Sequence, residues 1–339
     1  MVLPLPVLLL CAWLPLLLHL LPTAARPLGS SSRRRSTPAR IVLFGDSLSD
    51  NGNGSFALTR RAWPADAAYF DGRFSNGPTW IEYVAQAYFA PPLDRGLDDG
   101  AFGGATLDDV RVQGYTGINS TIPVPGVFAQ IERYLAKHTP ACDELYVVSG
   151  GSNDAFFALG TPLFDSPERF AAQSAELIQQ GVERLRKHGA RTFLLPLGPM
   201  LSSSPYALSA SSAIRSQLAR YSAALRAAVS AQVALYKARH PLDVAIVLFE
   251  TSLDAHAHEF KHADTPCLEG AYGEAPRRLC DEPDEYVYWD LYHPSTRAHA
   301  IIAKQALQAL RVAGLPPPSQ PHDEQLRLQA LSPHRATQR

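Results

Sequence analysis

Ile41-Val42-Leu43-Phe44-Gly45-Asp46-Ser47-Leu48 begins the folded part of this 339-residue chain and indicates its architecture. Its four leading apolar residues end in a Gly-Asp-Ser turn, as is typical of a short strand buried on both faces. Such strands build parallel sheets covered by helices, and ligands bind beyond the carboxyl ends of the strands. We therefore expect Ser47 at this edge of a sheet, either as a reactive group or as an ordinary turn residue.

The rest of the chain continues the pattern of buried strands separated by amphipathic helices. Three more apolar runs predict strands, at residues 144–148, 192–195 and 244–248. Helical periodicity is present at residues 79–88, 127–137, 167–188, 210–239 and 294–312. The alternation predicts an α/β chain in which a parallel sheet lies between two layers of helices.

The composition disfavours two classes of partner. Hydrophobic residues make up 46% of the chain and charged residues 19%, which is enough apolar material for a large core. The formal net charge is −1, so nothing favours binding to nucleic acid or to an anionic membrane surface. A neutral substrate fits this charge best.

The two ends of the chain differ from its centre. Residues 1–25 combine an apolar run with Thr23-Ala24-Ala25, which predicts a cleaved signal peptide; prolines within the run disfavour the alternative of a membrane anchor. Residues 26–38 read as a flexible basic leader, in which Arg33-Arg34-Arg35 allows a processing site as an alternative. The folded domain is expected at residues 39–315, followed by a disordered tail at 316–339.

If the chain is secreted, its cysteines are able to form disulfides and its Asn-x-Ser/Thr motifs are able to carry glycans. Cys267 and Cys280 enclose a polar loop that a disulfide would order, so we predict that they are bonded. Cys142 is predicted to be a buried free thiol ahead of a strand. Asn119 and Asn53 begin Asn-x-Ser/Thr motifs and are candidate glycosylation sites. Asn119 is the better candidate, because a glycan on Asn53 would lie close to Ser47.

A serine becomes a nucleophile when a base takes its proton, and His293 is the best-placed base. It lies in Asp290-Leu291-Tyr292-His293-Pro294, where Asp290 is three residues away and is able to share one face of a tight turn. Such a carboxylate accepts a hydrogen bond from the imidazole and fixes its tautomer. The alternative is a structural Asp–His pair that caps the last helix.

Two further segments offer donors for a developing negative charge. Gly150-Gly151-Ser152-Asn153-Asp154 follows the strand at 144–148, which places the Asn153 side chain at the same sheet edge as Ser47. Phe102-Gly103-Gly104-Ala105-Thr106 offers backbone N–H groups that no side chain obstructs. Their alternative interpretations are a helix cap and an ordinary turn.

A metal site is not predicted. Asp254-Ala255-His256-Ala257-His258 contains a His-x-His pair, but tight transition-metal sites usually have three or four ligands. A solvated helix face is the preferred interpretation. Asp71, Arg73 and Asn76 either line the site of Ser47 or hold their own loop together.

Four segments, in this order along the chain, together resemble one family: Phe44-Gly45-Asp46-Ser47-Leu48-Ser49-Asp50-Asn51-Gly52-Asn53, Ala101-Phe102-Gly103-Gly104-Ala105, Gly151-Ser152-Asn153-Asp154 and Asp290-Leu291-Tyr292-His293-Pro294. They are similar to the motifs of the GDSL-type lipases/esterases of the SGNH hydrolase superfamily. The stretch Asp71-Gly72-Arg73-Phe74-Ser75-Asn76-Gly77-Pro78-Thr79-Trp80 resembles the secreted members found in fungi and bacteria. The Gly-x-Ser-x-Gly elbow of the other large hydrolase class is absent from the sequence.

The resemblance implies a flavodoxin-like three-layer α/β/α sandwich with a mostly parallel five-stranded sheet, and acyl-ester hydrolysis without a metal or another cofactor. It implies that Ser47 is the nucleophile, His293 the base and Asp290 the group that orients the base. The N–H groups of Ser47 and Gly104 and the side chain of Asn153 would form the oxyanion hole. Asp99-Gly100 departs from the family pattern, which usually has Asn two residues before Ala101, and this leaves Gly103 as an alternative to Gly104.

We therefore expect a secreted serine ester hydrolase whose partners are small-molecule or polysaccharide esters, with no nucleic acid and no stable membrane insertion after signal removal. The alternatives are an acetylesterase of plant polysaccharides and a non-catalytic carbohydrate-binding or wall protein. Five aromatic residues suit either sugar stacking or core packing: Trp63, Tyr69, Phe70, Phe74 and Trp80. The sequence determines neither the acyl chain length nor the oligomeric state.

Overall fold

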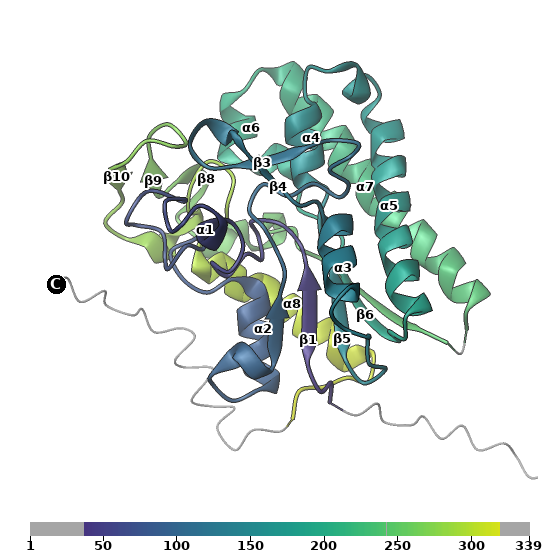
Figure 1. Ribbon diagram of the computed structural model, residues 1–339. Coiled ribbons are helices and arrows are strands. Elements are labelled where there is room, and N and C mark those ends of the chain that lie inside the picture. The colour runs from purple at the N-terminus through teal and green to yellow at the C-terminus, as the bar shows by residue number, and fades with distance from the viewer. Residues whose placement is uncertain (1–36, 242, 319–339) are drawn as a thin grey trace, which may run out of the picture. The chain divides into compact units, whose positions relative to one another are not determined.

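The structure is a computed structural model that describes residues 37–241 and 243–318. Its centre is a five-stranded sheet in which every pair of neighbouring strands is parallel (Figure 1). The order is β2-β1-β5-β6-β7, with bounds β1 Ile41–Phe44, β2 Leu97–Asp99, β5 Leu145–Val148, β6 Thr192–Pro196 and β7 Ala245–Phe249. The predicted parallel α/β architecture is confirmed.

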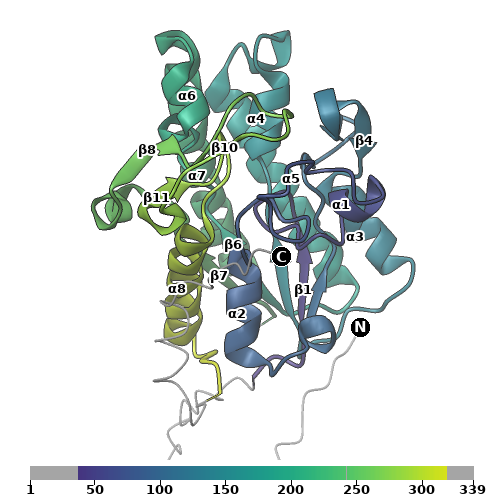
Figure 2. The same cartoon turned by 90° about the vertical axis from the view of Figure 1, so that its left-hand side faces the viewer.

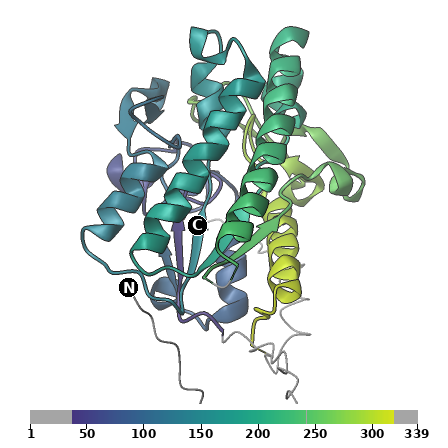
Figure 3. The ribbon, with the colours of Figure 1, turned by 90° about the vertical axis from the view of Figure 1, so that its right-hand side faces the viewer.

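Helices cover both faces of this sheet. On one face lie α2 (Trp80–Tyr88) and α8 (Thr296–Val312), which stand in front of the sheet in Figure 2. The other face is covered by α3 (Val127–Leu135), α5 (Pro167–Lys187) and α7 (Ser212–Arg239), the teal and green helices nearest the viewer in Figure 3. The result is a three-layer sandwich.

Strand β1 explains why its sequence is apolar without alternation. Ile41 and Leu43 pack into the core beneath α2 and α8, whereas Val42 and Phe44 pack into the core beneath α3, α5 and α7. All four side chains are at most 2% exposed. Successive residues of a strand point to opposite faces, so a strand between two helical layers needs apolar residues at every position.

The structure differs from the predicted elements at β2, ahead of α7 and at the start of α8. Strand β2 had no apolar pattern to identify it, because it contributes three residues at the sheet edge and two of them are aspartates. The helix expected at 210–239 is α7, which begins at Ser212 because the Ser211 side chain caps it by accepting from the Ile214 N–H (3.3 Å); the short helix α6 (Pro205–Ser209) lies before the predicted range. In the same way Ser295 caps α8, which begins after Pro294.

Short elements surround the carboxyl edge of the sheet. They are the helices α1 (Ser55–Leu58) and α4 (Ser152–Ala158), the hairpin of β3 (Gly114–Thr116) with β4 (Ile122–Val124), the parallel pair β8 (His262–Pro266) and β11 (Tyr286–Tyr288), and the hairpin of β9 (Leu268–Glu269) with β10 (Arg278–Leu279). Six 3-10 helices complete the described elements: η1 (Leu93–Arg95), η2 (Ile118–Ser120), η3 (Pro162–Phe164), η4 (Leu201–Ser203), η5 (Asp254–Glu259) and η6 (Pro283–Glu285).

A disulfide joins Cys267 to Cys280 and closes the loop that contains β9 and β10. The prediction that Cys142 is buried is wrong. Cys142 is exposed, because it lies in the turn ahead of β5 and not in the strand itself.

Several predicted features of the chain ends are not covered. The signal peptide at 1–25, the leader up to residue 36 and the tail from residue 319 lie outside the described residues. Within the described residues, none of the helices combines the length and the apolar character that crossing a bilayer requires.

Candidate active site

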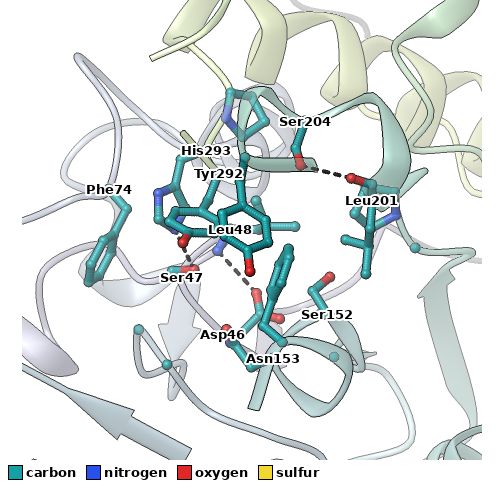
Figure 4. Close-up of a pocket in the computed structure, with 18 of the residues that line it drawn as sticks. Asp46, Ser47, Leu48, Phe74, Ser152, Asn153, Leu201, Ser204, Tyr292 and His293 are labelled. Atoms are coloured by element: carbon teal, nitrogen blue, oxygen red, sulfur yellow. Dashed lines mark hydrogen bonds between the residues drawn. The ribbon is translucent and has the colours of Figure 1, made fainter. Parts of the chain in front are cut away.

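Ser47 lies where the topology of the sheet creates a crevice. The chain passes from β1 to β2 on one side and later to β5 on the other side, so the loops after β1 and β5 diverge above the sheet. The loop after β1 is a tight turn: the carbonyl of Asp46 accepts the N–H groups of Ser49 and Asp50 (both 3.0 Å). The Asp46 carboxylate accepts the Leu48 N–H (3.1 Å), which presents the Ser47 hydroxyl to the crevice (Figure 4).

The hydroxyl of Ser47 meets the imidazole of His293 across 246 positions of sequence. Ser47 Oγ lies 2.8 Å from His293 Nε2 (Figure 4). On the far side of the ring, His293 Nδ1 lies 2.8 Å from Asp290 Oδ2 and 2.9 Å from Oδ1. The carboxylate accepts the Nδ1 proton, so the neutral ring carries its free lone pair on Nε2, facing the serine.

Asp290 is fully buried and yet held in its ionised form. Its Oδ1 accepts the backbone N–H groups of Tyr292 and His293 (both 2.8 Å), and its Oδ2 accepts the hydroxyl of Tyr69 (2.6 Å). Burial works against the charge, but the nearby His293 and the hydrogen bonds from His293, Tyr69 and Tyr292 lower the pKa of Asp290 below its usual value. Sequence reasoning had not connected Tyr69 with this carboxylate, because the two residues lie 221 positions apart.

The glycine segment after β2 offers one free backbone donor beside Ser47. The Gly103 N–H is already used, because it donates to the Asp50 carboxylate (2.8 Å). Within the described residues, the N–H groups of Gly104 and Ser47 donate to no protein acceptor. Gly104 has φ +87°, and a Cβ there would collide with the carbonyl of Tyr115, so this position requires glycine.

Asn153 reaches the same place from the start of α4. Its Nδ2 donates one proton to the Ala105 carbonyl (2.9 Å), and an amide nitrogen has a second proton to give. Asn153, Gly104 and Ser47 all line one pocket, and Figure 4 shows the side chain of Asn153 below that of Ser47. The structure thus brings all five predicted active-site residues together.

The pocket above Ser47 has a volume of about 260 Å³ and a largely apolar wall. Aromatic and aliphatic side chains come from several elements that are distant in sequence, among them Phe156, Phe157, Met200, Leu201, Leu253 and Ile302. Hydroxyl groups stand among them, from Ser152, Ser204 and Tyr292 (Figure 4). An apolar pocket beside a polar reacting centre fits the acyl part of an ester.

Buried carboxylates brace the loops of the site without reaching the reacting atoms. Asp50 accepts four backbone N–H groups, from Gly52 (3.0 Å), Gly54 (3.1 Å), Ser55 (2.8 Å) and Gly103 (2.8 Å). It thereby ties the loop that contains Ser47 to the glycine segment. Burial raises the pKa of Asp50 from its usual value, and the four hydrogen bonds oppose that rise.

Asp71, Arg73 and Asn76 hold their loop together and do not line the pocket, whereas Phe74 of the same loop does (Figure 4). The Arg73 guanidinium forms an ion pair with Glu82 on α2 (2.6 Å). The Asn76 side chain accepts the N–H of Thr296, the first residue of α8 (2.8 Å). This loop therefore ties α2 and α8 together below the site.

Three of the five aromatic residues that could stack on sugars, Trp63, Phe74 and Trp80, line the pocket although they are nearly buried. Trp63, Tyr69, Phe74 and Trp80 are at most 7% exposed, and among the five candidates Phe70 is exposed.

The His-x-His stretch forms η5 on the surface, where His256 pairs with Glu259 (2.6 Å). Within the part of the chain that the structure describes, no three metal-binding side chains converge.

Both glycosylation candidates are exposed, but their surroundings differ. Asn119 stands at the tip of the β3–β4 hairpin, and its neighbour Ser120 lines the pocket. Asn53 precedes Ser55, which is fully buried and donates its hydroxyl to the Gly103 carbonyl (2.8 Å). A glycan on Asn119 would therefore stand beside the pocket, a proximity that its distance from Ser47 in the sequence conceals.

Comparison with known proteins identifies relatives of this arrangement. Residues 41–306 match the family model described as GDSL-like Lipase/Acylhydrolase. The chain is 28% identical over 289 residues to the thermolabile hemolysin of Vibrio parahaemolyticus, covering 80% of this chain and 63% of that protein. It is 26% identical over 273 residues to the secreted effector protein SseJ of Salmonella typhimurium, covering 78% and 62%. The match thus spans less than two thirds of each of these relatives.

Among solved structures, the chain resembles LAE5, an alpha/beta hydrolase enzyme from the metagenome of Lake Arreo, with a TM-score of 0.44 and 15% identity. That match covers 83% of this chain and 98% of LAE5. The family model matches most of the chain and spans both the Ser47 loop and the Asp290–His293 segment. The chain belongs to the family of GDSL-like lipases and acylhydrolases.

Proposed function

We propose that the protein is a secreted serine ester hydrolase that acts through an acyl-Ser47 intermediate. The observation that carries the proposal is the hydrogen-bonded line from Ser47 Oγ through the His293 ring to Asp290, with distances of 2.8 Å on either side of the ring. Such a line is what a weakly nucleophilic hydroxyl needs in order to lose its proton as it attacks. Membership of the acylhydrolase family supports the same reaction.

In the first half of the reaction, Ser47 Oγ attacks the ester carbonyl while its proton passes to His293 Nε2. Asp290 stabilises the imidazolium that forms and keeps its orientation. His293 then gives the proton to the leaving alcohol as the tetrahedral intermediate collapses. In the second half, a water molecule repeats these steps on the acyl-enzyme and releases the acid, and Ser47 regains its proton.

In this mechanism, three hydrogen-bond donors stabilise the negative charge that develops on the carbonyl oxygen: the N–H groups of Ser47 and Gly104 and the side chain of Asn153. We favour Gly104 over Gly103 because the Gly103 N–H is occupied by Asp50 (2.8 Å). Donors fixed in advance stabilise the transition state without reorganising. No step of this mechanism needs a metal or an organic cofactor.

Labelling with a serine-directed fluorophosphonate tests the proposal. The wild-type chain should react at one site. Ser47→Ala should no longer be labelled, and its esterase activity should fall by about 10³-fold or more. Ser49→Ala is a matched control two residues away, because Ser49 is buried and its hydroxyl accepts from the Trp80 indole (3.0 Å). Labelling that persists in Ser47→Ala would overturn the proposal.

The apolar wall of the pocket favours acyl groups longer than acetyl. Each buried methylene contributes about 0.8 kcal/mol, or about fourfold in kcat/KM, until the pocket is full. Activity on nitrophenyl esters should therefore rise from acetate towards medium-length chains. Acetylated xylan is the competing substrate, and a kcat/KM that is highest for acetyl esters would instead support an acetylesterase of polysaccharides.

Secretion is part of the proposal, and the Cys267–Cys280 disulfide supports it. Disulfides persist in oxidising compartments and are rare in the cytosol. The apolar run ahead of Thr23-Ala24-Ala25 supplies the signal peptide, so the mature chain would begin near Arg26. The exposed Asn119 motif would then be the main glycosylation site.

A further inference from the structure

A second row of hydrogen bonds lies behind Asp290, on the side away from Ser47. The hydroxyl of Tyr69 donates to Asp290 Oδ2 (2.6 Å), and the Arg277 guanidinium donates in turn to the Tyr69 oxygen. The Tyr69 ring is 7% exposed and packs edge-on against Phe74 and Trp289. The row therefore continues the line of Ser47 and His293 from the proposed nucleophile to a half-buried cation.

The disulfide-closed loop holds Arg277 in this place. Its backbone N–H donates to the carboxylate of Asp66 (2.7 Å), three residues before Tyr69. The start of the loop is fixed beside Asp290, because the Leu268 N–H donates to the carbonyl of Trp289 (2.7 Å). Within the described residues, Tyr69 is the one hydrogen-bond partner of the Arg277 guanidinium, since the Nε and Nη1 atoms are buried without a partner.

The carboxylate depends on this row because bulk solvent does not reach it. Asp290 is fully buried, and its two carboxylate oxygens accept different numbers of hydrogen bonds. Oδ1 accepts two backbone N–H groups besides the imidazole, whereas the other donor to Oδ2 is Tyr69. Burial and the charge of Asp290 raise the pKa of Tyr69 well above its usual value, so its hydroxyl stays protonated and donates.

We propose that Tyr69 and Arg277 are positioning residues for the general base: Arg277 orients the Tyr69 hydroxyl, which fixes Asp290 and limits how much negative charge it offers to His293. The inference rests on the proposed ester hydrolysis at Ser47. A carboxylate that shares its charge with Tyr69 and Arg277 stabilises the imidazolium less. Losing either residue therefore loosens the His293 ring and makes it more basic.

Tyr69→Phe removes the hydroxyl and keeps the ring. We expect kcat/KM for a nitrophenyl ester to fall by about 10- to 100-fold, the usual cost of losing a hydrogen bond to a buried charge. We also expect the acidic limb of the kcat/KM–pH profile to move to higher pH. Tyr88→Phe is the matched control, since this buried tyrosine donates to the Leu315 carbonyl, far from Ser47 in the fold.

The acidic limb separates a positioning role from a merely structural one. The other titratable groups near His293 are Asp46, His299, Tyr272 and Tyr292, and none of them changes in this variant. A loss of packing would lower the activity and leave the limb in place. Thermal unfolding of each variant shows whether the fold is retained.

Arg277→Met and Arg277→Lys give an independent arm of the experiment, since both retain the backbone N–H to Asp66. The methionine variant should shift the limb in the same direction as Tyr69→Phe, and lysine should restore part of the wild-type profile. Wild-type rates and an unmoved limb in Tyr69→Phe and Arg277→Met would overturn this inference alone. A wild-type chain with neither labelling nor esterase activity would instead overturn the proposed function.

Discussion

In the proposed mechanism, the side chain of Asn153 serves two purposes. One Nδ2 proton is donated to the Ala105 carbonyl, which fixes the orientation of the amide, and the other remains available to a ligand in the pocket. The first bond makes the second useful, because a donor that is already oriented does not need to reorganise in the transition state.

Asn153→Ala should lower kcat by about 10²- to 10³-fold and change KM little, because the oxyanion exists in the transition state and not in the bound ester. Steady-state kinetics on one nitrophenyl ester measure both constants. Ser152→Ala, at the neighbouring position of α4 and also in the pocket wall, is the control for local disturbance. A kcat within threefold of wild type would remove Asn153 from the oxyanion hole.

At the scale of elements, α4 is tied to the core by a buried acid. Asp154 is 1% exposed and accepts the Leu107 N–H (3.0 Å), so it anchors α4 to the loop that follows the glycine segment. Burial raises the pKa of Asp154 to about 7. The folded chain therefore binds this proton more tightly than the unfolded chain, in which the pKa is about 3.9.

The raised pKa has a defined consequence for stability. The contribution of protonated Asp154 to the free energy of unfolding is fully present below pH about 4 and is lost as the pH rises through about 7. The side chain introduced by Asp154→Asn cannot titrate. The free energy of unfolding of this variant, measured relative to wild type, should therefore increase between pH 5 and pH 8, by up to about 1.4 kcal/mol per pH unit. Urea unfolding at both pH values measures the gain.

The comparison of Asp154→Asn with wild type cancels the other buried acids, whose pKa values are raised in both chains, such as Asp46 (to about 6) and Asp50. Asp165→Asn, on the surface after η3, serves as the control and should follow wild type at both pH values. Parallel stability curves for Asp154→Asn and wild type would contradict a titrating Asp154.

At the scale of the whole molecule, the order of the strands places the site. Strand β1 has neighbours on both sides that come later in the chain, so the loops after β1 and β5 open a crevice between them. Ser47 enters it from the loop after β1, Asn153 from the start of α4, which follows the loop after β5, and His293 from the segment before α8. The disulfide-closed loop adds Tyr272 to the wall of the same pocket.

Expression of the full chain in a secreting eukaryotic host tests the proposed fate of its amino terminus. We expect an active product in the medium whose first residue lies at or near Arg26, because the run before it has a signal peptide's composition. N-terminal sequencing identifies the first residue. An active chain that stays in the membrane fraction with residues 1–25 attached would support the anchor instead.

Most of the proposed active-site residues could be named from sequence because they follow a strand or precede a helix with a recognisable pattern; Gly104 follows β2, which has none, and was named from the family motif. Residues 41–44 and 144–148 have the apolar character of buried strands, so the polar residues after them were expected at one edge of the sheet. Ser47 and Asn153 lie there, and His293 meets Ser47 at 2.8 Å. Local pattern and family motif were sufficient, because backbone direction fixes where a strand ends.

The choice between Gly103 and Gly104, and the roles of Tyr69 and Arg277, required the tertiary structure. Which glycine N–H is free depends on Asp50, about 50 residues away, and the pairing of Tyr69 with Asp290 spans 221 positions. No periodicity encodes such contacts, because they arise where separate loops meet. The sequence alone thus determined the parallel α/β fold and the residues proposed to react, whereas long-range packing decided which groups contact them.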